Sequence, residues 1–510
     1  MVNKVYSNRI SEYAHENGGR VLLLFLLFLL AIYELLSGGI SIFAAICVLP
    51  FAIIYIYSSF RWRLSTFWTL IAINYFIQMK DIPLPVPMSL PNEMLEILLL
   101  AIAIIDVRQT THFERAGNIM LLALMIWSGF CLLELLNNTC NLGINISAWF
   151  TGFRLMSLQL LWIFLVFTIY IDSPETLMRY LKLWAFFSLF SAIWTWKQST
   201  FGFTAAEHIW LETRGRTTHI LNAGTLIRYF STFSDAANYG CHAAGAAVAF
   251  IIIGISSKIK KNKKLFLLIS IAVIWGMFQS GTRTAIFCLG FGLLVYVFLS
   301  KSVRIAVPFL IVFSIFAFIL VFTTIGNGNQ QIRRMRSAFN KDDASANVRD
   351  VNKEAIRGYI KDAPWGIGLG MGWDNVPSNN KYFKLATVPP DSEYVFIWIR
   401  TGKIGITVFL ISMGLIFLGA CRVVLFELKS QALIGIGSGL CGAFAAIQLG
   451  AYGNQVLYQY PNGLTFFGGM AIVYILPYIE PKWKAYENSE IAKEEEKKRL
   501  KLEKKLAKRV

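Results

Sequence analysis

The sequence predicts an all-α, polytopic integral membrane protein with about fourteen transmembrane helices and one long periplasmic loop. Of 510 residues, 56% are hydrophobic and only 15% are charged, whereas a soluble chain carries about a quarter charged residues. Apolar runs near bilayer length recur along the chain, for example Val21–Leu36, Leu265–Gln279 and Ile305–Thr324. Such runs must be helical in hydrocarbon, where the backbone has no water to bond. Buried core helices would explain one or two of these runs, but not more than ten.

The orientation follows from the loop Lys258–Lys264, which holds five lysines and is therefore predicted to be cytoplasmic. Counting from this loop puts both termini in the cytoplasm. The segments 64–79 and 91–106 are short and flank a proline-rich stretch, so a re-entrant pair is an alternative for them. The predicted spans are 20–37, 39–59, 64–79, 91–106, 117–136, 154–172, 177–198, 235–256, 264–280, 283–300, 304–325, 402–423, 431–453 and 463–480.

This topology divides the chain into a cytoplasmic N-terminus (1–19), a transmembrane region (20–480) and a charged cytoplasmic tail (481–510). The first apolar run is followed at once by further spans, so we expect a retained helix and not a cleaved signal. The tail is expected to be a solvated helix, with a partner-binding coiled coil as the alternative. The segments expected outside are 199–234, the turn 280–283 and the long loop 326–401.

The bulk charge and the cysteines exclude other classes. The formal charge of +18 is concentrated in short loops and the tail, which is how membrane proteins fix their orientation, so it does not indicate nucleic-acid binding. The seven cysteines lie mostly inside apolar runs without CxxC spacing, which argues against a disulfide scaffold or a zinc site. No cluster with metal-ligand spacing is evident, and we expect neither a metal nor a cofactor.

Four arginines stand out in the segments predicted to face outward: Arg228, Arg283, Arg349 and Arg357. Guanidinium groups stay charged and bind phosphate oxygens in pairs, so several of them at the outer boundary suit a lipid diphosphate headgroup. Each has a plainer alternative. Arg283 could snorkel to headgroups, Arg228 could pair within its loop, and Arg349 could be a solvated charge on the expected amphipathic helix 347–361. The basic run Arg333–Arg336 is expected to be a headgroup-binding patch or a flexible loop.

The context of these arginines resembles the O-antigen polymerase and O-antigen ligase superfamily. The resemblance covers about residues 220–425, with the same order of spans. Members of that superfamily carry an arginine before a Phe-x-Asp/Asn element, a Ser/Thr-Arg turn, an arginine and amphipathic helix before a glycine-rich stretch, and a polar-polar-x-Tyr element before x-G-x-x-G. The matching residues here are Arg228 with Phe233 and Asp235, Thr282-Arg283, Arg349 with Pro364–Gly372, Asp391–Tyr394, and Gly402 with Gly405.

One position departs from the superfamily pattern. Its ligases have a catalytic histidine followed by asparagine where this chain has Asp391-Ser392, and residues 326–401 contain no histidine. The departure counts against a ligase, although a ligase that uses the carboxylate stays open, and polymerase-type members remain compatible. The glycines Gly366–Gly372 also resemble a nucleotide loop. They follow no parallel strand and face away from the cytoplasm, which argues against that interpretation.

The resemblance implies a metal-independent glycosyltransferase that polymerises undecaprenyl-diphosphate-linked oligosaccharides at the periplasmic face of the bacterial inner membrane. The products would be O-antigen (lipopolysaccharide), capsule or exopolysaccharide. We assign catalysis to Asp391 as base with Arg283 and Arg228 on the diphosphate, although Asp391 could instead cap the following helix. Substrate binding is assigned to Arg349, Arg357, Tyr394 and Asp235. Besides the lipid-linked donor, the glycan acceptor and the bilayer, a chain-length regulator or another envelope protein is an implied partner.

Two alternatives remain. A ligase would move finished glycan to a lipid or protein acceptor. A polysaccharide transporter or flippase should show repeated halves and ionisable groups at mid-bilayer. The sequence shows no such halves, and its informative charges lie at the outer ends of spans, which favours the enzyme.

Overall fold

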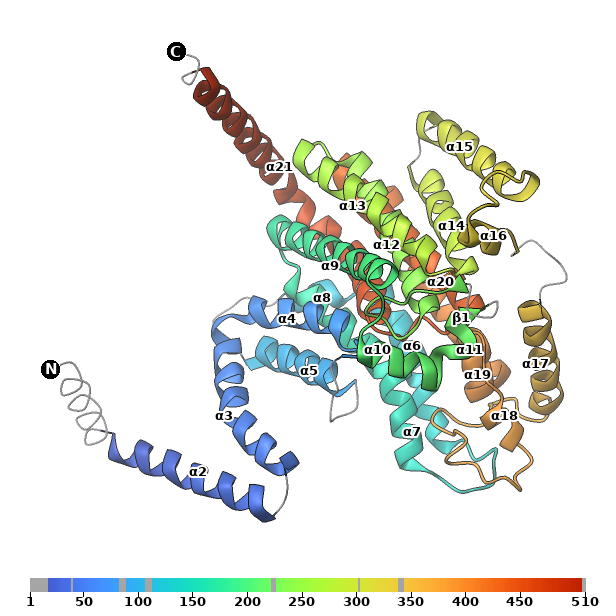
Figure 1. The fold of residues 1–510 in the computed structure, drawn as a ribbon. Coiled ribbons are helices and arrows are strands. Elements are labelled where there is room, and N and C mark those ends of the chain that lie inside the picture. Colours follow the sequence, from blue (N-terminus) through green and yellow to red (C-terminus); the bar gives the residue numbers. More distant parts are fainter. Residues whose placement is uncertain are drawn as a thin grey trace. The chain divides into compact units, whose positions relative to one another are not determined.

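The computed structural model describes residues 17–37, 40–81, 89–105, 112–221, 226–300, 303–337 and 344–506. Helices dominate these ranges (Figure 1). They are α2 (Gly18–Ser37), α3 (Ile40–Arg61), α4 (Arg63–Phe76), α5 (Leu90–Ile105), α6 (Ile119–Leu133), α7 (Ile146–Phe153), α8 (Gln159–Tyr170), α9 (Pro174–Thr200), α10 (Ala205–Trp210), α11 (Arg216–His219), α12 (Ala236–Ser256), α13 (Lys260–Gln279), α14 (Arg283–Leu299), α15 (Val303–Phe322), α16 (Gln330–Ser337), α17 (Ala344–Ile360), α18 (Phe383–Thr387), α19 (Glu393–Arg422), α20 (Gln431–Gly453) and α21 (Gly468–Leu506).

Short segments complete this inventory. The strands β1 (Ile220–Leu221) and β2 (Leu226–Ile227) pair antiparallel, with Ile220 opposite Ile227. Two 3₁₀ turns are η1 (Phe113–Ala116) and η2 (Glu134–Leu136). Four π-helical turns extend neighbouring helices: η3 (Arg154–Leu158), η4 (Leu211–Gly215), η6 (Val423–Glu427) and η7 (Gly463–Phe467).

The chain divides into two compact units, Met1–Thr66 and Phe67–Val510. In the first unit α2 packs against α3. Large apolar side chains such as Leu22, Phe25 and Phe51 are exposed on these helices. Exposed apolar surface of this extent is typical of helices that face lipid.

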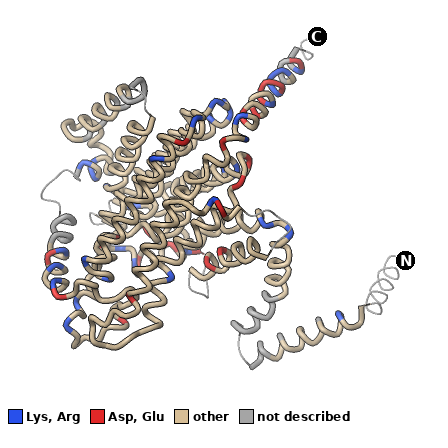
Figure 2. The backbone as a smooth tube through the Cα atoms, turned by 180° about the vertical axis from the view of Figure 1, so that it is seen from behind, with Lys and Arg blue, Asp and Glu red and all other residues tan. Residues whose placement is uncertain are grey.

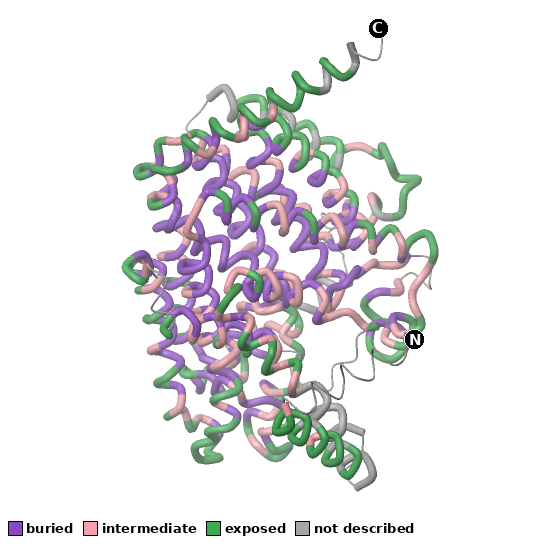
Figure 3. The backbone as a smooth tube through the Cα atoms, turned by 90° about the vertical axis from the view of Figure 1, so that its left-hand side faces the viewer, coloured by how far each residue is buried: buried purple, intermediate pink, exposed green. Residues whose placement is uncertain are grey.

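The second unit is organised around α12, which packs against α13, α14 and α20 (Figure 1). These helices approach closely because small residues line their contacts. A Cβ atom at Gly292 of α14 would lie 2.6 Å from the carbonyl oxygen of Gly442 in α20, and the reverse distance is the same. Small residues at helix contacts are what membrane helices use to pack, since hydrocarbon gives little hydrophobic drive. Of the six candidate membrane spans, those at Ala236–Ser256, Gln431–Gly453 and Gly463–Leu500 are the most buried. Figure 3 shows buried residues concentrated among the packed helices.

Each of the fourteen predicted spans falls on a helix in the predicted order. Within the described ranges, six helical segments are long and apolar enough to cross a membrane, so a multi-span membrane protein is confirmed. They are Ile119–Leu136, Ile146–Tyr170, Ala236–Ser256, Glu393–Glu427, Gln431–Gly453 and Gly463–Leu500. The count of fourteen stays a prediction, as does a re-entrant pair, because α4 and α5 have only 14 and 16 residues.

The lysine loop and the charged tail lie together at one end of the second unit. Nζ of Lys258 is 3.4 Å from Oε2 of Glu487, and the backbone N–H of Lys261 donates to Glu494. α21 runs without a break from the apolar region into the tail, where charges of both signs alternate (Figure 2). The two segments predicted to share the cytoplasmic side are therefore in contact. The expected helical tail is present.

α19 begins nine residues before the predicted span 402–423, at Glu393, and it is broken at Gly402. Gly402 has φ 64° and ψ −164°, which are not helical angles. The break frees two carbonyl groups that bond the glycine-rich stretch: Ile367 N–H donates to Ile399 O at 3.0 Å, and Gly368 N–H to Arg400 O at 2.9 Å. The predicted span began at Gly402, whereas α19 begins at Glu393. Gly402 interrupts this helix and does not start it.

The glycines of the 364–372 stretch are explained by packing. A Cβ at Gly366 would lie 2.5 Å from the backbone of Arg400, and Gly366 has φ +74°. A Cβ at Gly370 would overlap the carbonyl of Ala148 in α7. The stretch is therefore a clamp between α7 and the broken helix α19. Its glycines are needed because the backbones of these segments approach too closely for a side chain.

We expect Gly366→Ala to lower the thermal stability of the purified protein strongly, because alanine at this position combines a strained φ with a backbone clash. Each such effect costs about 1–3 kcal/mol. The matched control is Gly358→Ala in α17, where an added Cβ meets nothing within 4 Å. Intrinsic tryptophan fluorescence during heating would measure both variants. Equal melting temperatures for the two would contradict the packing role.

Candidate functional site

Arg228 lies against the turn that joins α13 to α14. Its Nε donates to Ser280 O at 3.3 Å, and its Nη2 donates to Thr282 Oγ1 at 3.1 Å. Its third contact, from Nη1, is to Thr218 O at 2.9 Å. Arg283 is the first residue of α14, directly after this turn. The two arginines predicted from distant parts of the sequence thus meet at one turn, on one side of the second unit.

The backbone around Arg228 is fixed by several independent bonds. Arg228 N–H donates to His219 O, and Tyr229 N–H donates to Gln279 O at 3.2 Å. Asp235 caps α12, since its Oδ1 accepts the N–H groups of Ala237 and Asn238. The sequence assigned Asp235 to substrate binding, and the structure gives it a helix-capping role.

Sequence reasoning missed Arg334 of α16, whose Nε donates to Gly281 O at 2.7 Å. The run Arg333–Arg336 forms part of a helix and not a flexible loop. Met335 is buried and fastens this helix to the second unit. Met335 is the single apolar residue in this basic run, and such a residue indicates that the run is a helix with one buried face. A third arginine therefore contacts the 280–283 turn.

Lys80 contacts the backbone between Arg228 and the start of α12. Its Nζ donates to Ser234 O at 3.0 Å and lies 4.3 Å from the centre of the Trp210 ring. Burial lowers the pKa of Lys80 to about 8, against the opposing attraction of Asp235 and Glu207. The amine therefore holds the backbone just before α12 in place.

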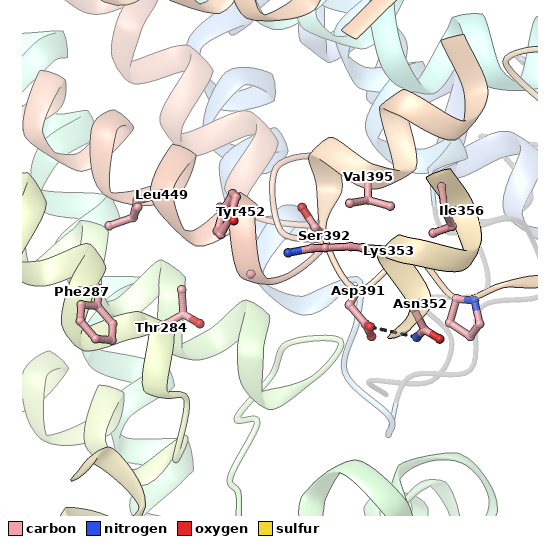
Figure 4. Close-up of a pocket in the computed structure, with 12 residues that line it drawn as sticks. Thr284, Phe287, Asn352, Lys353, Ile356, Asp391, Ser392, Val395, Leu449 and Tyr452 are labelled. Carbon is pink, nitrogen blue, oxygen red and sulfur yellow. Dashed lines mark hydrogen bonds between the residues drawn. The ribbon is translucent and has the colours of Figure 1, made fainter. Parts of the chain in front are cut away.

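A cavity of about 290 Å³ opens beside Arg283, between α14, α17, α19 and α20 (Figure 4). Thr284, the residue after Arg283, lines this cavity together with Asp391. Asn352 and Lys353 of α17 also line it, and Asn352 donates to Asp391 at 3.3 Å. Lys353 lies 5.0 Å from the ring of Tyr452, another lining residue. The cavity therefore joins a carboxylate and an amine next to the arginine turn.

The predicted helix cap at Asp391 is wrong. Ser392 occupies the N-cap position of α19, and its Oγ donates to Ala451 O at 3.1 Å. The Asp391 side chain is exposed and contacts Asn352 of α17. Tyr394 does not line the cavity; its hydroxyl lies 2.8 Å from Oε1 of Gln448, on α20. The assignment of Tyr394 to substrate binding stays a prediction.

The other two predicted arginines lie on α17, which confirms the amphipathic helix expected at 347–361. Arg349 is placed one turn before Lys353, and its side chain lies outside the described residues. Arg357 is exposed, pairs with Glu354 at 3.5 Å and does not line the cavity. Asn352 and Lys353, which sequence reasoning missed, are the cavity residues of this helix. Ile356 is buried, and the helical spacing of Asn352 and Lys353 from it could have predicted that they lie on the same, inward face of α17.

In chemical terms the arrangement offers cations, a carboxylate and an opening between helices. The start of α14 adds backbone N–H groups and the positive end of a helix dipole beside Arg283, which favour bound anions. Within the ranges that the structure describes, no group of three or more His, Cys, Asp or Glu side chains could hold a metal ion.

The fold and the site define a multi-span membrane protein with a basic turn and a carboxylate-bearing cavity at the same end of its helices. Residues 265–410, which contain the turn, α17 and Asp391, match the family described as O-antigen ligase, Wzy_C. This match supports the O-antigen ligase and polymerase superfamily, which the sequence motifs predicted. No curated protein matches the chain.

His219 makes the Arg228 region sensitive to acid. Its Nε2 accepts the N–H of Ala236 at 3.0 Å, so Nδ1 carries the proton. Burial, together with the charge of Arg228, lowers the pKa of His219 to about 4. The unfolded chain then binds more protons than the folded chain between pH 6.5 and 4, so stability is lost as the pH falls through this window.

We expect His219→Gln to reduce the drop in melting temperature between pH 7 and pH 4.5, because glutamine does not titrate. The contribution removed is on the order of 3 kcal/mol at most. His208→Gln is the control, since His208 is exposed in the neighbouring α10. If both variants keep the full pH dependence of the native protein, His219 is not the responsible group.

Proposed function

We propose that this protein is a membrane glycosyltransferase that polymerises undecaprenyl-diphosphate-linked oligosaccharides at the periplasmic face of the bacterial inner membrane. One observation carries the proposal: Thr284, next to Arg283, and Asp391 line the same cavity, and Arg228 and Arg334 bond the turn just before it. A diphosphate held at this turn would have the carboxylate within the adjoining cavity. In this proposal both termini lie in the cytoplasm, on the side of the lysine loop.

The reaction needs charge stabilisation at the leaving group and removal of one proton. The acceptor hydroxyl oxygen attacks the anomeric carbon of the donor sugar, and a new glycosidic bond forms. The bond from that carbon to the phosphate oxygen breaks, and the lipid diphosphate departs with the electron pair. Asp391 takes the hydroxyl proton. The energy comes from the activated donor, so no nucleotide is consumed.

The contacts of each cation decide its role in this proposal. Three Arg228 nitrogens already donate to neutral oxygen atoms, so this side chain chiefly shapes the turn. Arg283, at the start of α14, is the residue we assign to the diphosphate, and Lys353 lines the cavity that the next residue, Thr284, also lines. Arg349 lies four residues before Lys353 in α17, a spacing that puts both on one helix face. It joins the site as the third cation.

A polymerase is preferred to a ligase because Asp391 stands where ligases of this superfamily carry a histidine. A ligase that uses the carboxylate is the second candidate, and a flippase is the third. These three leave different lipid-linked intermediates in a deletion strain. A polymerase leaves single repeat units on lipid, a ligase leaves long unattached chains, and a flippase leaves intermediates on the cytoplasmic face. Capsule, exopolysaccharide and O-antigen are all compatible products.

We expect Arg283→Gln to reduce glycan chain growth by about 100- to 1,000-fold, the usual loss when one preorganised donor to a developing anion is removed. Arg283→Lys should also fail if paired contacts to phosphate are needed. Gel analysis of lipid-linked and polymeric glycan would measure chain growth, with immunoblotting of the membrane fraction for protein level. Arg216→Gln removes the same charge from an exposed position and should retain activity. Full activity in Arg283→Gln would sink the assignment.

Asp391→Asn should abolish chain growth while leaving the protein in the membrane, because the amide cannot accept the hydroxyl proton. Asp391→His should restore part of the activity, since imidazole is also a base of suitable strength. Asp362→Asn serves as the control, because Asp362 is exposed and pairs with Lys381 outside the cavity. Wild-type rates in Asp391→Asn would remove Asp391 from the mechanism.

A further inference from the structure

A second cavity adjoins another face of α19. Its volume is about 370 Å³, within the range of small-molecule sites, which is about 300–1,000 Å³. Glu393, Phe396 and Arg400 line it, and their spacing puts them on one face of the helix. Ser392 and Val395 line the first cavity instead. The segment of α19 before Gly402 therefore separates the two cavities.

Arg400 is the cation of this second cavity. Its guanidinium makes neither a hydrogen bond nor an ion pair within 4 Å to any residue that the structure describes, and its Nε and Nη1 are buried. It lies 5.3 Å from the ring of Phe396, and Asp374 is the acid whose charge acts on it. A half-buried guanidinium whose N–H groups lack hydrogen-bond acceptors is unfavourable by itself, and an anionic ligand would supply those acceptors.

Glu393 does not serve as the counter-charge. Its Oε2 accepts the N–H of Leu457 at 3.0 Å, and its carboxylate also faces the N–H groups of Val456 and Tyr458. These bonds attach the 456–458 segment to the start of α19. The carboxylate is therefore committed to the backbone, and the cavity keeps the positive charge of Arg400.

The remaining lining groups suit a ligand rich in hydroxyl groups. The side-chain amides of Gln78, Gln455 and Gln459 line the cavity, and Gln78 donates to Gln459 at 3.1 Å. The hydroxyl of Tyr458 is buried without a hydrogen-bond partner in the described ranges. Amides both donate and accept, as sugar hydroxyls do, and the Tyr460 ring adds an apolar surface. A purely apolar occupant such as a lipid tail would leave these groups unpaired.

We propose that this cavity binds the acceptor glycan through an acidic sugar, with Arg400 on the sugar carboxylate and the amides and Tyr458 on its hydroxyl groups. The inference rests on the proposed function and names a second substrate site for it. Donor diphosphate and acceptor sugar would then lie on neighbouring faces of one helix segment. The acidic sugar gives the enzyme its acceptor preference.

Binding of short oligosaccharides to the full-length protein in phosphatidylcholine nanodiscs tests this proposal by isothermal titration calorimetry. The probes are trigalacturonic acid, neutral maltotriose and inorganic phosphate. We expect trigalacturonic acid to bind at least tenfold more tightly than either of the others. Arg400→Gln should remove this preference, and Tyr458→Phe should weaken binding several-fold. Lys403→Gln, an exposed charge three residues along α19, should bind like the native protein.

The outcomes are separable from those of the proposed function. Arg283→Gln should still bind trigalacturonic acid normally, because Arg283 lies outside this cavity. If a deletion strain shows normal glycan chain growth, the proposed function fails whatever the binding result. The acceptor site is overturned if trigalacturonic acid does not bind, if phosphate or maltotriose binds equally well, or if Arg400→Gln and Tyr458→Phe both bind like the native protein. Melting temperatures show that each variant is folded.

Discussion

The turn Ser280–Arg283 is the contact on which the rest of the site depends. Its backbone oxygens accept bonds from Arg228 and Arg334, and Thr282 Oγ1 donates to Ala236 O at the start of α12. A Cβ at Gly240 would lie 2.4 Å from Ser280 Oγ, so α12 must present glycine there. The turn between α13 and α14 thus contacts α12 through the Thr282 side chain and α16 through its own backbone. Charge can be gathered at this point because the arginine side chains stabilise the structure that holds them.

The break in α19 is the second constraint, and it follows from a different kind of chemistry. Glycine at 402 releases the carbonyl groups of Ile399 and Arg400, and the glycine-rich stretch satisfies both of them. At membrane depth a broken helix is tolerated only where protein or a polar cavity covers the freed groups. The clamp therefore fixes the first part of α19, which carries Glu393 and Arg400 and begins just after Asp391.

The order of helices and the meeting of Arg228 with the 280–283 turn were predictable because apolar runs, charges in loops and short motifs are local signals. Other features depend on packing between distant segments, which leaves no local pattern. Lys353 and Asn352 reach the cavity through the register of α17 against α19, and Arg400 lies at the end of the predicted loop 326–401, outside the motifs that pointed to the site. The helix-capping role of Asp235 left no separate signal, because a helix cap and a ligand use the same carboxylate, and its assignment to substrate binding stays a prediction. The glycine-rich stretch was noticed for its composition, whereas its purpose lies in contacts to α7 and α19.

The position of the two cavities suggests why the wall between them is a short helical segment. A group-transfer enzyme with two large substrates must bring two reacting atoms together while keeping each substrate in its own site. A helix of two or three turns supplies side chains to both sides and has one exposed end. Asp391 lies at that end, just before Ser392, where groups bound on either face can meet. A base placed further along α19 would face one cavity alone, so under the proposed function the end of the helix is the position that would serve both substrates.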